Sequence, residues 1–144
     1  MKAKQFLSQI AHDEIVTAIR EAEKMTSGEI RVFVSHKTIE HALPAAQRHF
    51  VRLKMDRTGE RNAVLIFVAP ATCQFAVVGD VGVHTRCGDA FWQELAGEMS
   101  GHFRRSDFTR GLVHGIRKAG ELLARHFPHS PDDQNELPDD VAHD

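Results

Sequence analysis

The spacing of apolar residues along the chain switches between two periods, and each period predicts one kind of element. Apolar residues recur every three or four positions in four segments, which predicts amphipathic helices over 8–25, 42–55, 89–103 and 107–127. Three shorter segments are strongly apolar, which predicts strands over 29–35, 62–70 and 74–78. The chain is therefore expected to combine a small sheet with covering helices.

The order of these elements also predicts how the strands pair. The first two strands flank a helix, and such a crossover places its strands parallel with a right-handed connection. Only residues 71–74 separate the second strand from the third, so the third should return antiparallel as a hairpin. The expected class is an α/β fold with a short, mixed sheet.

Length and composition indicate one domain followed by a different C-terminal segment. The 144 residues suffice for a single hydrophobic core, which we assign to 1–127. Residues 128–144 are acidic, contain prolines and hold few apolar side chains. They are expected to form a disordered tail.

Charge and hydropathy narrow the class of protein. The formal net charge is −2, which gives no electrostatic reason to expect a nucleic-acid partner. No apolar stretch approaches the roughly 20 residues that span a bilayer, and the first residues lack the apolar core of a secretion signal. We therefore expect a cytoplasmic protein with no membrane span.

One stretch after the third predicted strand carries groups that suit a ligand site. Gly79 and Gly82 bracket Asp80 and Val81, so that backbone amides could approach an anion, or Asp80 could bind calcium through its carboxylate. The alternative is a tight turn with a capping aspartate. Asp89 lies where the next helix begins, as a first-turn acid or as a second metal ligand.

The edges of the predicted sheet do not gather these residues into one site. Ligands on open α/β sheets bind beyond the carboxyl ends of the strands, where Ser35 and His36 follow the first strand. Asp80 is expected toward the opposite edge. Glu29 and Arg31 lie at the amino end of the first strand, where a structural role is expected.

The two cysteines offer a further, weaker hypothesis. Cys73 and Cys87 are expected as free thiols in a reducing compartment. Cys87 at a helix N-terminus would have a lowered pKa and could act as a nucleophile near His84, although a small buried side chain is the plainer interpretation. The Cys-x5-Arg pattern of cysteine phosphatases is absent, since Trp92 stands five residues after Cys87.

Five short blocks also occur in a characteristic order along the chain: Thr26-Ser27-Gly28-Glu29-Ile30, Asn62-Ala63-Val64-Leu65, Gly79-Asp80-Val81-Gly82, Cys87-Gly88-Asp89-Ala90-Phe91-Trp92 and Phe108-Thr109-Arg110-Gly111-Leu112. Together they resemble the TPM domain family, which is named for thylakoid lumen, photosystem repair and nematode receptor-modulator members. The resemblance covers residues 10–127. It implies a three-layer α/β/α sandwich around a short, mixed, mostly parallel sheet.

The resemblance also implies two possible functions. Some members of the family are weak acid phosphatases and others bind calcium, so Asp80 and Asp89 would hold calcium or another divalent metal, with no organic cofactor. Many relatives carry an Asp-Arg or Asp-Lys pair after the second strand, where this chain has Ala71-Thr72-Cys73-Gln74. No general base or other catalytic residue is evident either. The sequence therefore favours a module that binds calcium or a protein partner, with a metal-assisted phosphatase as the alternative.

Overall fold

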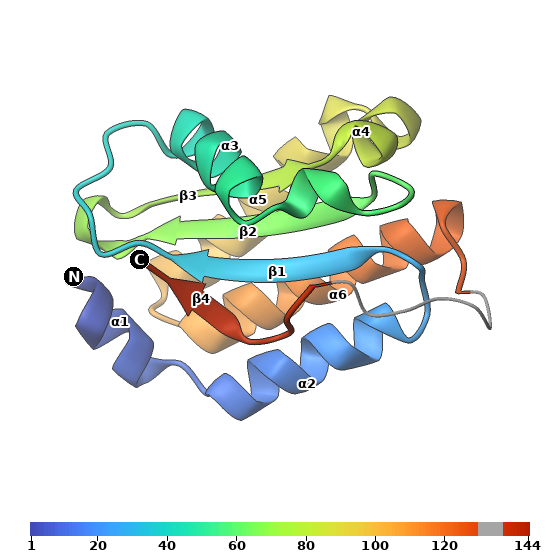
Figure 1. Cartoon of the computed structure of the whole chain (residues 1–144). Coiled ribbons are helices and arrows are strands. Elements are labelled where there is room, and N and C mark those ends of the chain that lie inside the picture. The colour runs from blue at the N-terminus through green and yellow to red at the C-terminus, as the bar shows by residue number, and fades with distance from the viewer. Residues whose placement is uncertain (130–136) are drawn as a thin grey trace.

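A four-stranded sheet forms the centre of the molecule in the computed structural model, which describes residues 1–129 and 137–144 (Figure 1). The strands lie in the order β3-β2-β1-β4, with the bounds β1 (Glu29–Val34), β2 (Ala63–Ala69), β3 (Gln74–Gly79) and β4 (Val141–His143). β1 pairs in parallel with β2 and β4, whereas β2 and β3 pair antiparallel across the short 3₁₀ helix η2 (Pro70–Thr72). The predicted mixed, mostly parallel sheet is confirmed.

One face of the sheet is covered by the amphipathic helices α1 (Ala3–Gln9), α2 (His12–Glu23), α5 (Asp89–Arg104) and α6 (Phe108–His126). Alternate residues of β1 and β2, such as Ile30 and Ile66, point toward these helices and are fully buried. Leu112 and Ile116 of α6 meet them from the other side. None of the described helices is long and apolar enough to cross a bilayer.

The opposite face is covered by α3 (Ala42–Arg52) and the 3₁₀ helix η1 (Met55–Arg57). Phe33 and Phe67 from neighbouring strands stack there with ring centroids 5.8 Å apart, and His49 of α3 lies against both rings. Burial lowers the pKa of His49, which favours the neutral imidazole in this core. Helices therefore cover both faces, and the α/β/α sandwich is confirmed.

The helix predicted over 8–25 is divided into two helices. Ile10 and Ala11 have extended backbone dihedrals, which end α1 and start α2 at His12. Ile10 is buried in the core, and Phe6 of α1 packs on Phe108 with ring centroids 4.9 Å apart. Phe6 and Ile10 are buried in the same core cluster as Ile15 and Ile19 of α2, so both helices contribute to one core.

The glycine-bracketed turn expected over 79–82 is the start of a further helix, α4 (Val81–Cys87). Asp80 is its N-cap and accepts a hydrogen bond from the backbone N of Val81 at 2.8 Å. Gly88, with φ of 73°, ends α4 immediately before α5. Valine and glycine are poor helix formers, which is why the sequence did not indicate this helix.

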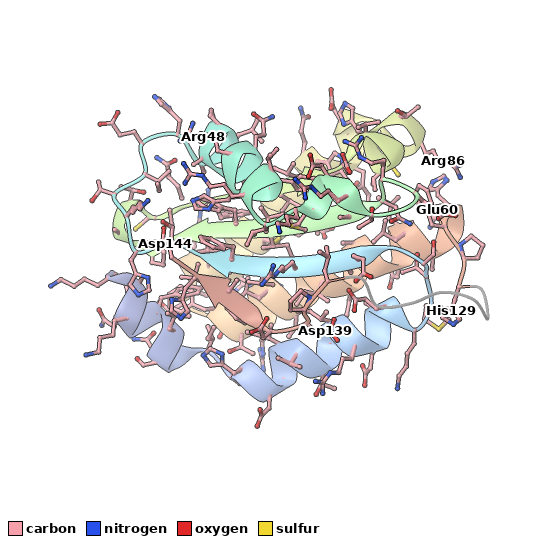
Figure 2. All side chains as sticks on the ribbon, viewed as in Figure 1. Arg48, Glu60, Arg86, His129, Asp139 and Asp144 are labelled. Carbon is pink, nitrogen blue, oxygen red and sulfur yellow. The ribbon has the colours of Figure 1, made fainter. Side chains whose placement is uncertain are left out.

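The prediction of a disordered tail over 128–144 is wrong for residues 137–144. β4 pairs with Val32–Val34 along the edge of β1. The Asp144 carboxylate accepts hydrogen bonds from Ser35 Oγ and His36 N, both at 2.6 Å. Figure 2 shows Asp144 beside the carboxyl end of β1 and Asp139 nearer to α2. At the start of the predicted tail, Pro128 forms an isolated antiparallel bridge with Thr26, and residues 130–136 lie outside the described residues.

Candidate metal centre

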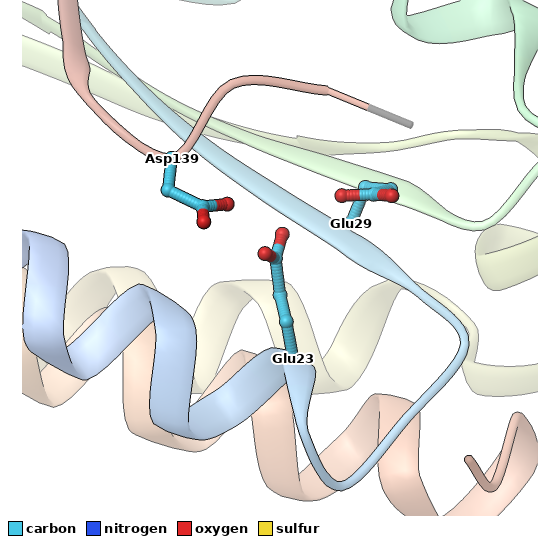
Figure 3. A group of neighbouring side chains, drawn as sticks. All are labelled: Glu23, Glu29 and Asp139. Carbon is cyan, nitrogen blue, oxygen red and sulfur yellow. The ribbon is translucent and has the colours of Figure 1, made fainter. Parts of the chain in front are cut away.

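Three carboxylates from separate parts of the chain meet beside β1 (Figure 3). Glu23 is the last residue of α2, Glu29 is the first residue of β1, and Asp139 lies two residues before β4. One oxygen from each lies within 4.8 Å of the other two. In the part of the chain that the structure describes, no other three His, Cys, Asp or Glu side chains gather their ligand atoms as closely.

The short length of β4 explains why the cluster forms at this edge. β4 pairs only with Val32–Val34, which leaves the first half of β1 without a neighbouring strand among the described residues on that side. There the Glu23 side chain provides the hydrogen-bond acceptor that a neighbouring strand would provide, since its Oε2 accepts a hydrogen bond from the backbone N of Ile30 at 2.9 Å. Asp139 lies at the same edge because β4 runs parallel to β1, with Val141 opposite Val32. The two residues before β4 therefore lie beside the start of β1.

The turn between α2 and β1 holds the two glutamates near each other. Thr26 in this turn donates its hydroxyl to the carbonyl of Phe127 and accepts a hydrogen bond from the backbone N of Gly28 at 3.0 Å. Gly28 packs closely, since an added Cβ would lie 2.9 Å from Leu123 Cδ1. The turn is therefore fixed to the C-terminal end of α6, and with it the positions of Glu23 and Glu29.

Burial and mutual repulsion disfavour three negative charges in this cluster. Glu29 is only 2% exposed. Burial raises the pKa of Glu23 to about 10, and its hydrogen bonds to Asp139 and Glu29 add to the rise, while the hydrogen bond from Ile30 opposes it. Glu23 therefore holds a proton at neutral pH. Arg20 offsets part of the remaining charge, with its Nε 3.6 Å from Asp139 Oδ2.

The donor set fits a hard divalent cation. Calcium takes six to eight oxygen ligands at about 2.3–2.6 Å, so the oxygens of one shell lie within about 5 Å of each other, as these carboxylate oxygens do. Glu23 and Asp139 are half-buried, which leaves room for water to complete the shell. The absence of a nitrogen or sulfur ligand from this group of three favours calcium or magnesium over zinc or copper.

Asp80, predicted from the sequence as a metal ligand, has its carboxylate engaged by other groups. It is 6% exposed and accepts hydrogen bonds from Arg61 Nε at 2.7 Å and from the terminal Nη2 of Arg61 at 3.0 Å. The hydrogen bond from Val81 N adds a third donor. A cation at Asp80 would have to displace the guanidinium of Arg61.

Asp89, the second predicted ligand, lies in the first turn of α5. Its side chain is 76% exposed, and its Oδ1 lies 3.4 Å from Nε2 of His84. Asp80 and Asp89 are not among the three carboxylates that the structure gathers. The sequence therefore did not identify the group of ligands that the fold brings together.

Gly79 and Gly82, expected to line a ligand loop, allow close packing of protein atoms. A Cβ on Gly79 would lie 2.7 Å from Cζ2 of Trp92, and one on Gly82 would lie 2.5 Å from the carbonyl oxygen of Arg61. Gly82 N also donates to that carbonyl at 2.9 Å. Gly79 therefore lets Trp92 of α5 pack on the end of β3, and Gly82 lets α4 approach the segment before β2.

The structure also shows the surroundings of the two cysteines and of the residues after the first strand. Cys73 is exposed between η2 and β3. Cys87 lies at the C-terminal end of α4, not at a helix N-terminus, and burial raises the pKa of its thiol. The expectation of a lowered pKa is therefore wrong. Ser35 and His36 at the carboxyl end of β1 bind the Asp144 carboxylate.

Comparison with known proteins agrees with this fold. The sequence matches the TPM domain over residues 1–122. The NMR structure of the BA42 protein from the psychrophilic bacterium Bizionia argentinensis is 40% identical with a TM-score of 0.85, over 94% of this chain and 96% of that one. No curated protein matches the chain.

Two more distant structures share the fold alone. The N-terminal domain of cg2496 from Corynebacterium glutamicum is 16% identical, with a TM-score of 0.62 over 85% of this chain and 80% of that one. The N-terminal domain of a P. gingivalis protein is 14% identical, with a TM-score of 0.59 over 79% and 76% of the two chains. The domain match and the 40% identity over nearly the full length show that the chain belongs to the TPM domain family.

Proposed function

We propose that this chain is a calcium-binding module whose site is formed by Glu23, Glu29 and Asp139. The observation that carries the proposal is the gathering of three carboxylates, with one oxygen of each within 4.8 Å of the other two. The raised pKa of Glu23 agrees with it, because burial and neighbouring carboxyl groups favour a form of the cluster with less negative charge. A calcium ion would replace the proton on Glu23 and neutralise the cluster more fully. The cation would then connect α2, β1 and the segment before β4.

Calcium binding should appear as a change in stability. A ligand that binds only the folded state adds about 2.7 kcal/mol at a hundredfold excess over its Kd, which corresponds to a rise in Tm of about 5–10 °C for a chain of this size. We expect this rise for chelator-stripped protein at slightly alkaline pH. Glu29→Gln should remove it, because the amide keeps the side-chain shape and loses the charge.

A matched control separates the cluster from general charge effects. Glu94 is exposed on α5 and is no part of the cluster, so Glu94→Gln should keep the full response to calcium. The ligands predicted from sequence are tested in the same way with Asp80→Asn and Asp89→Asn. If Asp89→Asn loses the response and Glu29→Gln keeps it, the site lies at α5 and the proposal is wrong in its location.

The phosphatase alternative is decided with the same proteins. A bound divalent ion could polarise a phosphoryl oxygen, so we would measure hydrolysis of a chromogenic phosphate monoester with and without calcium, magnesium or manganese. A binding module predicts no metal-dependent turnover. Turnover that requires the metal and is lost in Glu29→Gln would show that the cluster is catalytic instead.

A further inference from the structure

We propose that the exposed side of the α5–α6 pair carries a second metal site, for a transition-metal ion such as Zn²⁺, with His102, His114 and Glu98 as its protein ligands. This site is independent of the calcium site proposed above, because it lies on different helices and offers imidazole nitrogens. Imidazole and carboxylate ligands suit zinc, nickel and copper.

The three side chains already lie close together. His114 of α6 donates from Nε2 to Glu98 Oε2 of α5 at 2.5 Å. The rings of His114 and His102 have centroids 5.5 Å apart. Glu98 and His102 are four residues apart on α5 and therefore project from the same face of the helix.

Two glycines of α6 produce this proximity. A Cβ on Gly111 would lie 2.5 Å from Cε1 of Phe103, and one on Gly115 would lie 2.7 Å from Sδ of Met99. Both positions flank His114 in the sequence, and both contacts are with α5. The helices therefore pack closely where His114 faces Glu98 and His102.

The spacing agrees with ligation of one metal. With Zn–N distances of about 2.0 Å, two imidazoles on a tetrahedral zinc have ring centroids about 5 Å apart, close to the observed 5.5 Å. A nitrogen and an oxygen on the same zinc lie roughly 3.3 Å apart, so His114 and Glu98 must separate by less than about 1 Å. The side chains of His114 and Glu98 are 29% and 39% exposed, which leaves a position for water.

Binding requires a change in the His102 side chain. In this structure no ring nitrogen of His102 lies close enough to His114 and Glu98 for all three side chains to bind one metal. The Nδ1 of His102 faces Nη2 of Arg105 at 3.4 Å instead. That distance is long for a hydrogen bond, and the Arg105 side chain is 62% exposed. Zinc can therefore displace Arg105 from His102 at little cost.

A second histidine pair provides a matched control. The rings of His36 and His143 have centroids 5.4 Å apart, beside the Asp144 carboxylate. That carboxylate already accepts hydrogen bonds from Ser35 Oγ and His36 N. We therefore expect His143→Gln to leave zinc binding at α5–α6 unchanged.

The test is calorimetric titration of the chelator-stripped protein with ZnCl₂, without calcium. The wild type should bind one zinc ion at this site, and His102→Gln and His114→Gln should each weaken binding by about tenfold to a hundredfold or more. Absence of zinc binding in the wild type would overturn the proposal. Zinc binding as tight as that of the wild type in both His102→Gln and His114→Gln would also overturn it. So would a loss of zinc binding in His143→Gln alone.

A measurement on the wild type alone guards against misfolded variants. On addition of zinc, the imidazole NMR signals of His102 and His114 should shift, and those of His36 and His143 should stay. Addition of calcium should leave all four unchanged. Zinc shifts confined to His36 and His143 would contradict the proposed site.

Discussion

At the scale of single residues, Glu23 links the stability of this protein to pH. Its pKa rises from an ordinary 4.5 to about 10, mainly through burial. Between these values the folded state holds a proton that the unfolded state has released, so raising the pH lowers the free energy of unfolding. Below about pH 4.5 Glu23 is protonated in both states, and its own contribution to stability is fully present.

We therefore predict that wild-type stability in a chelator falls steadily as the pH rises from about 5 to about 9, because the folded state holds a proton that the unfolded state has released. Glu23→Gln should flatten this dependence, because an amide resembles the protonated carboxyl and does not titrate. Urea unfolding at several pH values measures both slopes. Parallel slopes for the two proteins would show that another group causes the pH dependence.

At the scale of elements, the strongly periodic segments were predictable and the context-dependent ones were not. β1, β2, α3 and α6 follow directly from apolar residues at strand or helix spacing. α4 forms despite its weak propensity because Asp80 caps it and Gly82 packs on the segment before β2. β4 forms because Asp144 and the edge of β1 hold residues that would not form a strand alone.

The packing of α4 gives a prediction with an internal control. A Cβ at Gly82 would lie 2.5 Å from the Arg61 carbonyl oxygen and 2.6 Å from that of Glu60, and backbone atoms cannot move aside as side-chain ends do. Gly82→Ala should therefore destabilise the fold by about 1–3 kcal/mol or more. Gly97 of α5 has no such neighbour within 4 Å, so Gly97→Ala should stabilise by about 0.5–1 kcal/mol.

Denaturant midpoints of the two variants and the wild type measure this contrast. The same substitution has opposite expected signs at two helical positions, so a general effect of alanine on helix propensity cannot produce both results. A Gly82→Ala protein as stable as Gly97→Ala would mean that α4 can move away from Arg61 at little cost.

At the scale of the whole molecule, the candidate metal centre was hidden because tertiary structure assembles it. Glu29 was expected to be structural at the amino end of a strand, and Asp139 fell in the predicted tail. Their approach depends on β4 running beside β1, a pairing between residues more than a hundred positions apart. The sequence does contain one signal, an acidic residue at the start of a strand that is otherwise almost fully buried.

The C-terminal segment therefore has three roles that should fail together. Residues 137–144 provide Asp139 to the cluster, cover the edge of β1, and add Leu137 and Ala142 to the smaller core. A chain without these residues should still fold, since most core side chains precede residue 128. It should lose the calcium response and, because the edge of β1 is uncovered, associate more strongly as concentration rises.

Asp139→Asn in the full-length chain separates these roles. It removes one ligand and keeps β4, so it should lose the calcium-dependent rise in Tm without a change in association state. Thermal melts and light scattering over a range of concentrations distinguish the two proteins. A shortened chain with an undiminished calcium response would place the cation away from Asp139, whereas self-association of Asp139→Asn would show that this carboxylate, rather than strand pairing, keeps the edge of β1 covered.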